Sequence, residues 1–314
     1  MKILVTGGAG FIGSHVVDAL LKRKHEVIIL DDLSSGKKAF VNPSAKLIRA
    51  KVEDDKTVGL IKRLAPQAIY HFAAQKDARL SVVDPVLDAR TNIIGLLQLV
   101  KGAMQINLKR FVLASTGGAI YGGADEIPTP EEYPAHPLSP YGVSKLASEH
   151  YLHSYRHAGG FPFVSLRFAN VYGPRQNPKS EAGVIAIFIK AMLEGRAPII
   201  NGDGKQTRDY VYVDDVARAC LSALTAQPGI YNIGTGRETD LNQMVQMLNS
   251  LLGTSLDPVY GPAKMGEETR SAIAYTRAKN TFGWEPKVTI EQGLAKTIAW
   301  QKQMIREGKM KLIS

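Results

Sequence analysis

Cysteine is almost absent from this chain of 314 residues, which contains one, Cys220. A single thiol excludes an intramolecular disulfide framework and a cysteine-rich metal cluster. The chain also lacks any apolar run of the ~18–20 residues that a membrane span requires. Its opening residues, MKILVTGGAGFIG, are typical of a strand and a turn rather than of a signal peptide. We therefore expect a reducing, cytoplasmic setting and no membrane partner.

Acidic residues are fewer than basic ones. The chain has 29 Asp and Glu against 39 Lys and Arg, a formal net charge of +10. This excess is compatible with nucleic acid, an anionic surface or anionic small molecules as partners. The basic groups at 22–24 and 37–38 lack the interleaved aromatic residues that favour single-strand binding. We interpret them as solvated faces and expect no nucleic-acid partner.

Short β-branched runs alternate with segments of helical spacing through the first half of the chain. Strands that are apolar on both faces and alternate with helices indicate a parallel sheet covered on both sides. The predicted strands are Lys2–Thr6, Glu26–Asp31, Lys46–Arg49, Ala68–Phe72, Phe111–Ser115 and Phe163–Phe168. Right-handed crossovers then predict an α/β fold, a Rossmann-like doubly wound parallel sheet.

After about Asn170 the pattern loosens, and Gly and Pro cluster at 172–177, 201–204, 228–236 and 258–266. This change predicts a smaller, mixed α/β substrate-binding lobe. We assign residues 1–169 to the dinucleotide-binding domain, with about 208–227 returning to it. Residues 170–207 and 228–314 are assigned to the second lobe.

A glycine-rich turn, TGGAGFIG, joins the first predicted strand to the first helix. Gly7 permits a tight turn, Gly10 lets the backbone approach a diphosphate, and Gly13 lets helix and strand pack closely. The diphosphate would lie at the positive N-terminus of the helix. Asp31 ends the second strand, 31 − 13 = 18 residues after Gly13, where a carboxylate binds the adenosine ribose and repels a 2′-phosphate. The pattern therefore predicts NAD rather than NADP as the cofactor.

Tyr141 and Lys145 are four residues apart and so lie on one face of a predicted helix. A nearby ammonium favours the phenolate, so we expect it to lower the pKa of Tyr141, which suits a general base. Ser115 and Thr116 end a strand upstream, where they could bind a substrate hydroxyl.

These features resemble the extended short-chain dehydrogenases/reductases, the NAD-dependent epimerase/dehydratase family, and among them most the UDP-glucose 4-epimerases. The resemblance covers nearly the whole chain. It rests on TGGAGFIGSH at Thr6–His15, SPYGVSK at Ser139–Lys145, RFANVYGPRQ at Arg167–Gln176 and GDGKQTRDYVYVDDVA at Gly202–Ala217. It implies 4-epimerisation of a UDP-sugar through a transient 4-keto intermediate, with Tyr141 as the base.

The resemblance also implies site residues. The cofactor set is Gly7, Gly10, Phe11, Ile12, Gly13, Asp31, Asp32, Ser35, Gly36, Phe72, Ala73, Ala74, Lys76, Asn92, Tyr141 and Lys145. The substrate set is Asn170, Val184, Arg208, Lys264 and Glu267, and no metal site is expected.

The chain departs from the epimerase pattern at three positions. Gly117 stands where these enzymes usually have the catalytic hydroxyl, so Thr116 is our substitute, with Ser115 behind it. Lys264 stands where an Arg usually binds the substrate phosphate. Ser271 stands where some epimerases have a bulky residue, so we hypothesise that UDP-N-acetylglucosamine is accepted along with UDP-glucose.

Other activities remain open as alternatives. They are UDP-glucuronate epimerase, dehydratase or reductase activity, and a non-catalytic NAD-binding regulatory module. Gly117 and Gly118 replace the acid pair that 4,6-dehydratases carry after the strand-end Thr, which favours epimerisation.

The helices at 92–105 and 142–157 resemble those that pair in homodimers of the family, so a homodimer is expected.

Overall fold

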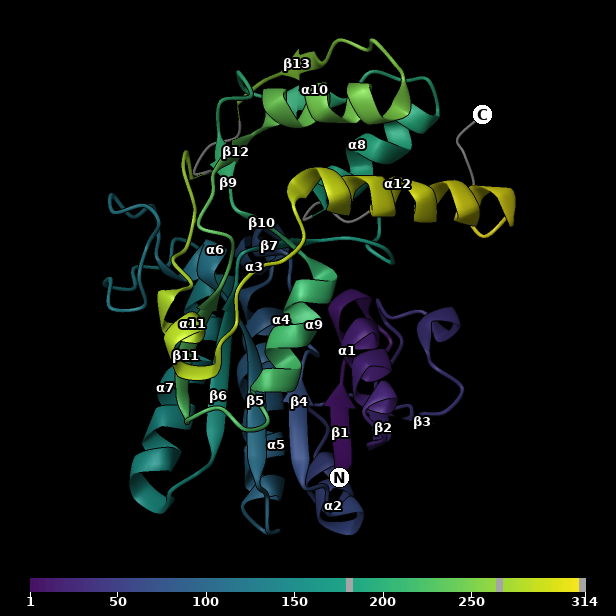
Figure 1. Cartoon of the computed structure of the whole chain (residues 1–314). Helices are drawn as coiled ribbons and strands as arrows, with labels where there is room; N and C mark the ends of the chain where they lie inside the picture. Colours follow the sequence, from purple (N-terminus) through teal and green to yellow (C-terminus); the bar gives the residue numbers. More distant parts are fainter. Residues whose placement is uncertain (179–182, 264–267, 311–314) are drawn as a thin grey trace.

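The protein has a seven-stranded parallel sheet with a smaller lobe above the carboxyl ends of its strands (Figure 1). The computed structural model describes residues 1–178, 183–263 and 268–310. The sheet strands are β1 (Lys2–Thr6), β2 (Glu26–Leu30), β3 (Lys46–Ile48), β4 (Ala68–His71), β5 (Arg110–Thr116), β6 (Phe163–Phe168) and β11 (Gly229–Ile233). The predicted fold class and six of these strands are confirmed, with ends that differ by a residue.

The strand order is β11-β6-β5-β4-β1-β2-β3, and every pair of neighbouring strands is parallel. The direction of winding reverses between β1 and β4. In doubly wound sheets, ligands bind at the carboxyl ends of the strands beside such a reversal. The order therefore places a binding crevice beside the glycine turn that follows β1.

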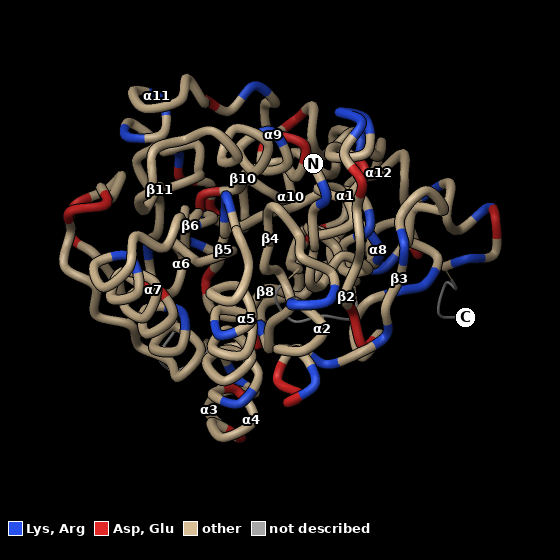
Figure 2. Tube along the Cα trace, turned by 90° about the horizontal axis from the view of Figure 1, so that it is seen from below, with Lys and Arg blue, Asp and Glu red and all other residues tan. Residues whose placement is uncertain are grey.

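Helices cover both faces of this sheet, as Figure 2 shows from below. On one face, α2, α5 and α7 pack over an apolar cluster that includes Leu4, Ile69 and Phe111. On the other face, α1, α9 and α11 cover a cluster that includes Val5, Tyr70 and Val164. The helices of this domain are α1 (Phe11–Lys22), α2 (Lys56–Leu64), α3 (Ala78–Val83), α4 (Pro85–Ala89), α5 (Gly95–Ala103), α6 (Gly117–Ile120), α7 (Pro140–Gly159), α9 (Val213–Ser222) and α11 (Thr276–Phe282).

The smaller lobe has its own core, in which tyrosines from two short strands pack against three helices. Its helices are α8 (Val184–Leu193), α10 (Leu241–Leu252) and α12 (Ile290–Arg306). Its strands pair as β7 (Asn170–Tyr172) with β10 (Tyr210–Tyr212), β8 (Ile199–Asn201) with β13 (Val259–Gly261), and β9 (Thr207–Arg208) with β12 (Thr239–Asp240).

One boundary differs from the sequence-based division. The segment after residue 228 was expected in the smaller lobe, but β11 pairs with β6 from Gly229 to Ile233 and completes the sheet. The helix α11 then packs on β11. The sequence did not predict this strand because Gly and Pro, which cluster around 228–236, are depleted in strands. Only its pairing with β6 in the folded chain identifies it.

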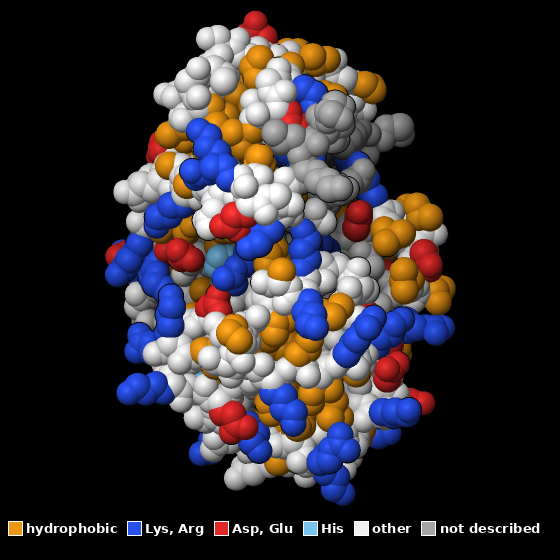
Figure 3. Space-filling model, turned by 90° about the vertical axis from the view of Figure 1, so that its right-hand side faces the viewer, with side chains coloured by type: hydrophobic (Ala, Val, Ile, Leu, Met, Phe, Trp, Pro, Cys, Tyr) orange, Lys and Arg blue, Asp and Glu red, His pale blue; other side chains and the backbone are white. Residues whose placement is uncertain are grey.

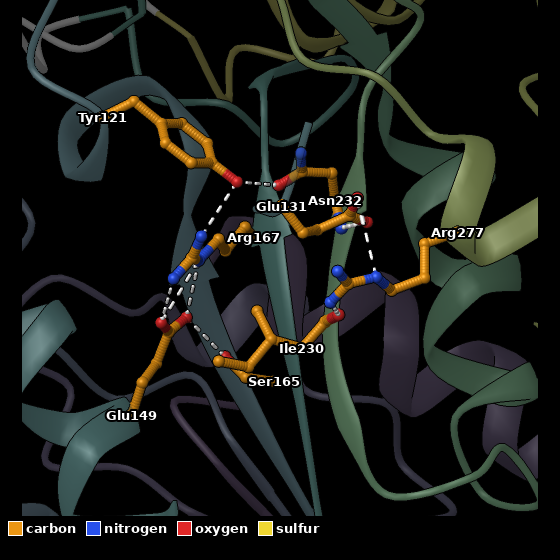
Figure 4. Close-up of polar contacts among 8 residues, drawn as sticks. All are labelled: Tyr121, Glu131, Glu149, Ser165, Arg167, Ile230, Asn232 and Arg277. Carbon is orange, nitrogen blue, oxygen red and sulfur yellow. Dashed lines mark hydrogen bonds and ion pairs between the residues drawn. The ribbon is translucent and has the colours of Figure 1, made fainter. Parts of the chain in front are cut away.

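A buried polar network fixes α7 against the sheet (Figure 4). Glu149 of α7 receives three hydrogen bonds from the Arg167 guanidinium on β6, from Nε at 3.1 and 3.2 Å and from Nη2 at 2.7 Å. Ser165 donates to the same carboxylate, and Arg167 Nη1 donates to the Tyr121 hydroxyl. Glu149 and Arg167 are 2% and 5% exposed. Each charge in this pair therefore depends on its partner rather than on water.

Replacement of Glu149 by Ala should destabilise the protein by about 3–5 kcal/mol, because it leaves the Arg167 guanidinium buried without a counter-charge. Urea unfolding measures this loss. The matched control is Glu132→Ala, which removes an ion pair with Arg277 whose glutamate side chain is 71% exposed. That control should cost less than about 1 kcal/mol. An equal loss of unfolding free energy in the two variants would contradict the buried, mutually dependent pairing of Glu149 and Arg167.

Candidate active site

The glycine turn after β1 has the close contacts that its sequence predicted. Gly7 has a φ of +67°, and a Cβ there would lie 2.5 Å from the Ala73 nitrogen on the loop after β4. A Cβ on Gly13 would lie 2.2 Å from the Gly7 carbonyl oxygen. Only glycine fits these two positions, so α1 begins directly beside the ends of β1 and β4. In the described chain, no side chain caps its N-terminus at Gly10. Its N–H groups, including those of Phe11 and Ile12, can therefore face an anion.

Asp31 is 7% exposed and lies directly beneath this turn. Its carboxylate accepts hydrogen bonds of 2.9 Å from the backbone nitrogens of Ala9 and Leu33. A Cβ on Gly36 would come within 2.8 Å of Asp31 Oδ1. Asp31 therefore ties the glycine turn to the loop after β2. The sequence predicted its contact with the ribose but did not show this structural role. The predicted residues Asp32 and Ser35 belong to the same loop, in which Asp32 accepts from Ser34.

The loop after β4 lies directly beside the glycine turn. His71 at the end of β4 is buried and bonds Thr6 of β1, with 2.8 Å between Nδ1 and Oγ1. The backbone of Phe72 and Ala73 approaches Gly7. Ala74 follows them and Lys76 is exposed at the rim. The predicted cofactor residues of this segment thus lie together beside the glycine turn.

A π-helical turn at Arg90–Ile94 places Asn92 in the interior. Its amide nitrogen donates to the Gln75 carbonyl and to Asp88 Oδ1, at 2.9 and 3.0 Å. Its Oδ1 is buried and finds no hydrogen-bond partner among the described residues, and the same is true of the Ser115 hydroxyl. Buried polar atoms left unpaired carry a free-energy cost that a bound ligand can remove. Two such atoms and the uncapped α1 N-terminus fit a dinucleotide at this crevice.

Tyr141 and Lys145 lie in the first turns of α7, which Ser139 caps by accepting from the Gly142 nitrogen. The Tyr141 nitrogen donates to Ser81, and Lys145 Nζ donates to the Ala114 carbonyl of β5 at 3.0 Å. The ammonium is 6.0 Å from the centre of the Tyr141 ring. The two side chains therefore share one helix face, as predicted, at the carboxyl end of β5.

The charge environment differs from the sequence-based expectation. Burial raises the pKa of Tyr141 to about 12, and the Asp88 carboxylate adds to that rise, while a hydrogen bond with Thr116 lowers it. The expected lowering by Lys145 is not found. Burial also lowers the pKa of Lys145 to about 8, against the opposing effect of Asp88 and Glu149. Desolvation, which a sequence cannot show, outweighs the interaction within the pair.

Thr116 is the hydroxyl that contacts Tyr141. Ser115 is 4% exposed on the preceding position of β5. A Cβ on Gly117 would lie 2.5 Å from Ile273 Cδ1, so Ile273 occupies the space that a side chain at 117 would need. A side chain at position 117 would require the end of the Ile273 side chain to shift.

The predicted substrate residues come from the lobe above. Asn170 of β7 lies beside the first turn of α6, since a Cβ on Gly118 would be 3.4 Å from Asn170 Oδ1. Arg208 is on β9, where its Nη1 donates to the Thr207 carbonyl. Val184 is the first residue of α8. Lys264 and Glu267 lie outside the described residues.

Two buried carboxylates near the site were missed by sequence reasoning. Asp88 of α4 is completely buried and bonds Gln75, Asn92 and Ser144. Asp209 accepts from the backbone nitrogens of Thr235, Gly236 and Ile273, and so holds the Ile273 segment against the site. Asp209 lies within the matching segment Gly202–Ala217, whereas Asp88 lies in none of the matching segments, and nothing in the sequence indicated that either carboxylate is buried.

No metal site and no nucleic-acid partner were expected from the sequence. His150, His153 and His157 are exposed on α7. Among the described residues, no group of three His, Cys, Asp or Glu could hold a metal ion. Basic side chains on the face formed by α1, β2, β3 and their loops are spread among acidic and apolar ones (Figure 3). In the described ranges no helix has the length and apolarity needed to cross a bilayer.

Comparison with known proteins agrees with this geometry. Residues 3–234 match the family model described as "NAD dependent epimerase/dehydratase family". The chain is 41% identical to a UDP-glucose 4-epimerase of Mycolicibacterium smegmatis, over 95% of this chain and 97% of that protein.

Solved structures superpose over nearly the whole chain. One is the UDP-glucose 4-epimerase of Thermotoga maritima with UDP-glucose, at 46% identity and a TM-score of 0.95, covering 97% of this chain and 100% of that one. Another is the Thermus thermophilus UDP-glucose 4-epimerase in complex with NAD, at 40% identity and a TM-score of 0.91, covering 96% and 99%. The chain therefore belongs to the NAD-dependent epimerase/dehydratase family.

Proposed function

We propose that this protein is an NAD-dependent UDP-sugar 4-epimerase that interconverts UDP-glucose and UDP-galactose. The observation that carries the proposal is the meeting of Tyr141, Lys145 and Thr116 at the carboxyl end of β5, beside a crevice that fits a dinucleotide. The similarity to UDP-glucose 4-epimerases over nearly the full length of both chains supports it.

Different residues of the site would bind different parts of the cofactor. The glycine turn and the α1 N-terminus would hold the diphosphate, Asp31 the adenosine ribose, and Asn92 and Lys145 the nicotinamide half. NAD supplies a hydride acceptor that also returns the hydride. The Asp31 carboxylate, already bound to Ala9 and Leu33, would repel the 2′-phosphate of NADP.

The protein side of the reaction is a proton transfer at the sugar 4-hydroxyl. Tyr141 accepts the proton from O4 as the C4 hydride leaves, which gives a 4-keto sugar. Thr116, at the end of β5 and close enough to lower the pKa of Tyr141, would hold the same oxygen. Lys145 would bind the nicotinamide ribose and so hold the cofactor beside Tyr141. After the ketose turns over in the site, the hydride returns to its other face and Tyr141 gives the proton back, so no net oxidation occurs.

Elimination is disfavoured by the residues at this strand end. A 4,6-dehydratase needs an acid pair directly after the strand-end Thr, where this chain has Gly117 and Gly118. A non-catalytic binding module would need neither Tyr141 nor Lys145. Arg208 and Asn170 would bind the substrate diphosphate, for which a guanidinium is suited.

We also propose that UDP-N-acetylglucosamine and UDP-N-acetylgalactosamine are substrates. Ser271 is two residues before Ile273, whose side chain packs on Gly117 at the reacting end of the site. A small side chain at 271 would leave space for an N-acetyl group on the sugar.

A homodimer working in the cytoplasm is the assembly we propose. Large apolar side chains are exposed on α3, α4 and the start of α7, which pack against one another. They include Val83 at 81%, Val86 at 67% and Val143 at 51% exposure. An apolar surface of this kind marks a protein interface. A second copy of the chain would bury it.

Replacement of Tyr141 by Phe should lower turnover of UDP-galactose by on the order of a hundredfold or more, because the acid–base hydroxyl is lost. NAD binding should persist, since Lys145 and Asp31 remain. Chromatographic separation of the UDP-sugars measures turnover. Tyr151→Phe on the exposed face of the same helix is the control and should leave turnover unchanged. Retained turnover in Tyr141→Phe would overturn the mechanism.

Replacement of Ser271 by Tyr should abolish conversion of UDP-N-acetylgalactosamine and spare that of UDP-galactose, because the larger side chain fills the space for the N-acetyl group. The ratio of the two kcat/KM values measures this selectivity. If the unmodified protein converts UDP-galactose but not the N-acetyl sugar, the proposed breadth is wrong.

Replacement of Val83 by Asp should give a monomer, because a charge would be desolvated in the proposed interface. Light scattering during size-exclusion chromatography measures the mass. Val259→Asp on β13 of the smaller lobe is a control with a similarly exposed valine. A monomeric unmodified protein would refute the dimer.

A further inference from the structure

Asp88 is a completely buried carboxylate on α4 that none of the steps above uses. Its Oδ1 accepts from Gln75 Nε2 and Asn92 Nδ2, each at 3.0 Å, and its Oδ2 accepts from the Ser144 hydroxyl. All three donors are neutral. Burying a carboxylate costs much less free energy when hydrogen bonds satisfy its oxygens. Bonds from neutral donors nevertheless leave its negative charge in place.

The three donors come from three separate walls of the site. Gln75 is on the loop after β4, and Asn92 is on the π-helical turn. Ser144 is on α7 between Tyr141 and Lys145. Asp88 therefore joins the nicotinamide side of the crevice to the helix that carries the acid–base pair.

The other buried carboxylate near Lys145 is committed elsewhere. Glu149 is paired with the Arg167 guanidinium through the fork described above (Figure 4), and it adds to the effect of Asp88 on Lys145 but is not among the groups that shift the pKa of Tyr141. Asp88 has no such cation among its hydrogen-bond donors, so its charge acts on the acid–base pair. An anion at this position attracts the Lys145 ammonium and disfavours the Tyr141 phenolate.

The remaining charged groups around α4 do not cancel this effect. His71 on β4 is buried, and burial lowers its pKa to about 3, so it is neutral at physiological pH. Arg79 of α3 and Arg90 of the π-helical turn are exposed to solvent, where their charges are screened. The Asp88 charge raises the pKa of both Tyr141 and Lys145.

We propose that Asp88 is a positioning residue of this site, one that fixes Asn92 and Ser144 and sets the pH range over which the Tyr141–Lys145 pair works. The proposal rests on the epimerase function proposed above. In this proposal the Asp88 carboxylate has two roles. It aligns Asn92 with α7, and its charge sets the pKa values of Tyr141 and Lys145.

The sign of the effect follows from the charge. Without the Asp88 anion, the Tyr141 phenolate forms more easily and the Lys145 ammonium loses its proton more easily. Both changes move in the same direction. The acidic and basic limits of the pH–kcat profile should therefore shift together to lower pH, whereas simple structural damage would lower the maximum and leave the limits in place.

Asp88→Asn is the test, because the amide keeps the shape and can still accept from Gln75 and Asn92. We expect both limits of the profile for UDP-galactose to fall by on the order of one pH unit. Asp84→Asn is the matched control. It removes a carboxylate one turn earlier on the exposed side of α4, where Asn also caps the helix, and should leave the limits unchanged. Asp88→Ser removes the same charge with a different shape and should shift them in the same direction.

A second readout does not depend on turnover. Phenolate absorbance, taken as the difference between each protein and its Tyr141→Phe counterpart, gives the titration midpoint of Tyr141. That midpoint should be lower by on the order of one unit in Asp88→Asn and Asp88→Ser than in the unmodified protein. Unchanged midpoints and limits in a folded Asp88 variant would overturn the proposal. An unmodified protein that fails to epimerise would refute the proposed function instead, while the absorbance titration would still decide the role of Asp88.

Discussion

The paired charges of Glu149 and Arg167 determine where α7 lies, and the site depends on the position of that helix. The pair is buried between α7 and β6, and its fork geometry fixes the helix in both distance and rotation. Tyr141 and Lys145 lie one to two turns from Glu149 on the same helix. A buried ion pair contributes little net stability when it is intact, but it strongly penalises any arrangement that separates its charges. It therefore specifies one placement of the catalytic helix on the sheet.

Around this helix the electrostatics combine two opposing effects. Burial disfavours both the Tyr141 phenolate and the Lys145 ammonium, and the two nearby carboxylates favour the ammonium alone. The resting chain therefore holds Tyr141 as a phenol. The positive charge of bound NAD would favour the phenolate, so cofactor binding and activation of the base are coupled in this account. The same low-dielectric surroundings strengthen the interactions that stabilise charge during the reaction.

The fold and the outline of the site could be predicted from the sequence, because both follow from local patterns. Alternating β-branched runs predicted six of the seven sheet strands, and the glycine spacing predicted the close contacts at Gly7 and Gly13. The seventh strand, β11, was missed because Gly and Pro residues cluster around it and only its pairing with β6 in the folded chain identifies it as a strand. The sign of the pKa change of Tyr141 was wrong because it depends on burial. Asp88 was missed for the same reason, since residues 75, 92 and 144 surround it only in the folded chain.

The central claim is that hydride leaves and returns within one site while Tyr141 moves only the proton. UDP-galactose deuterated at C4 tests it directly, by mass spectrometry of the UDP-glucose formed. The account predicts that the deuterium stays at C4 of the product and that no reduced cofactor is released. Loss of the deuterium to solvent, or a stoichiometric demand for added NAD, would contradict it.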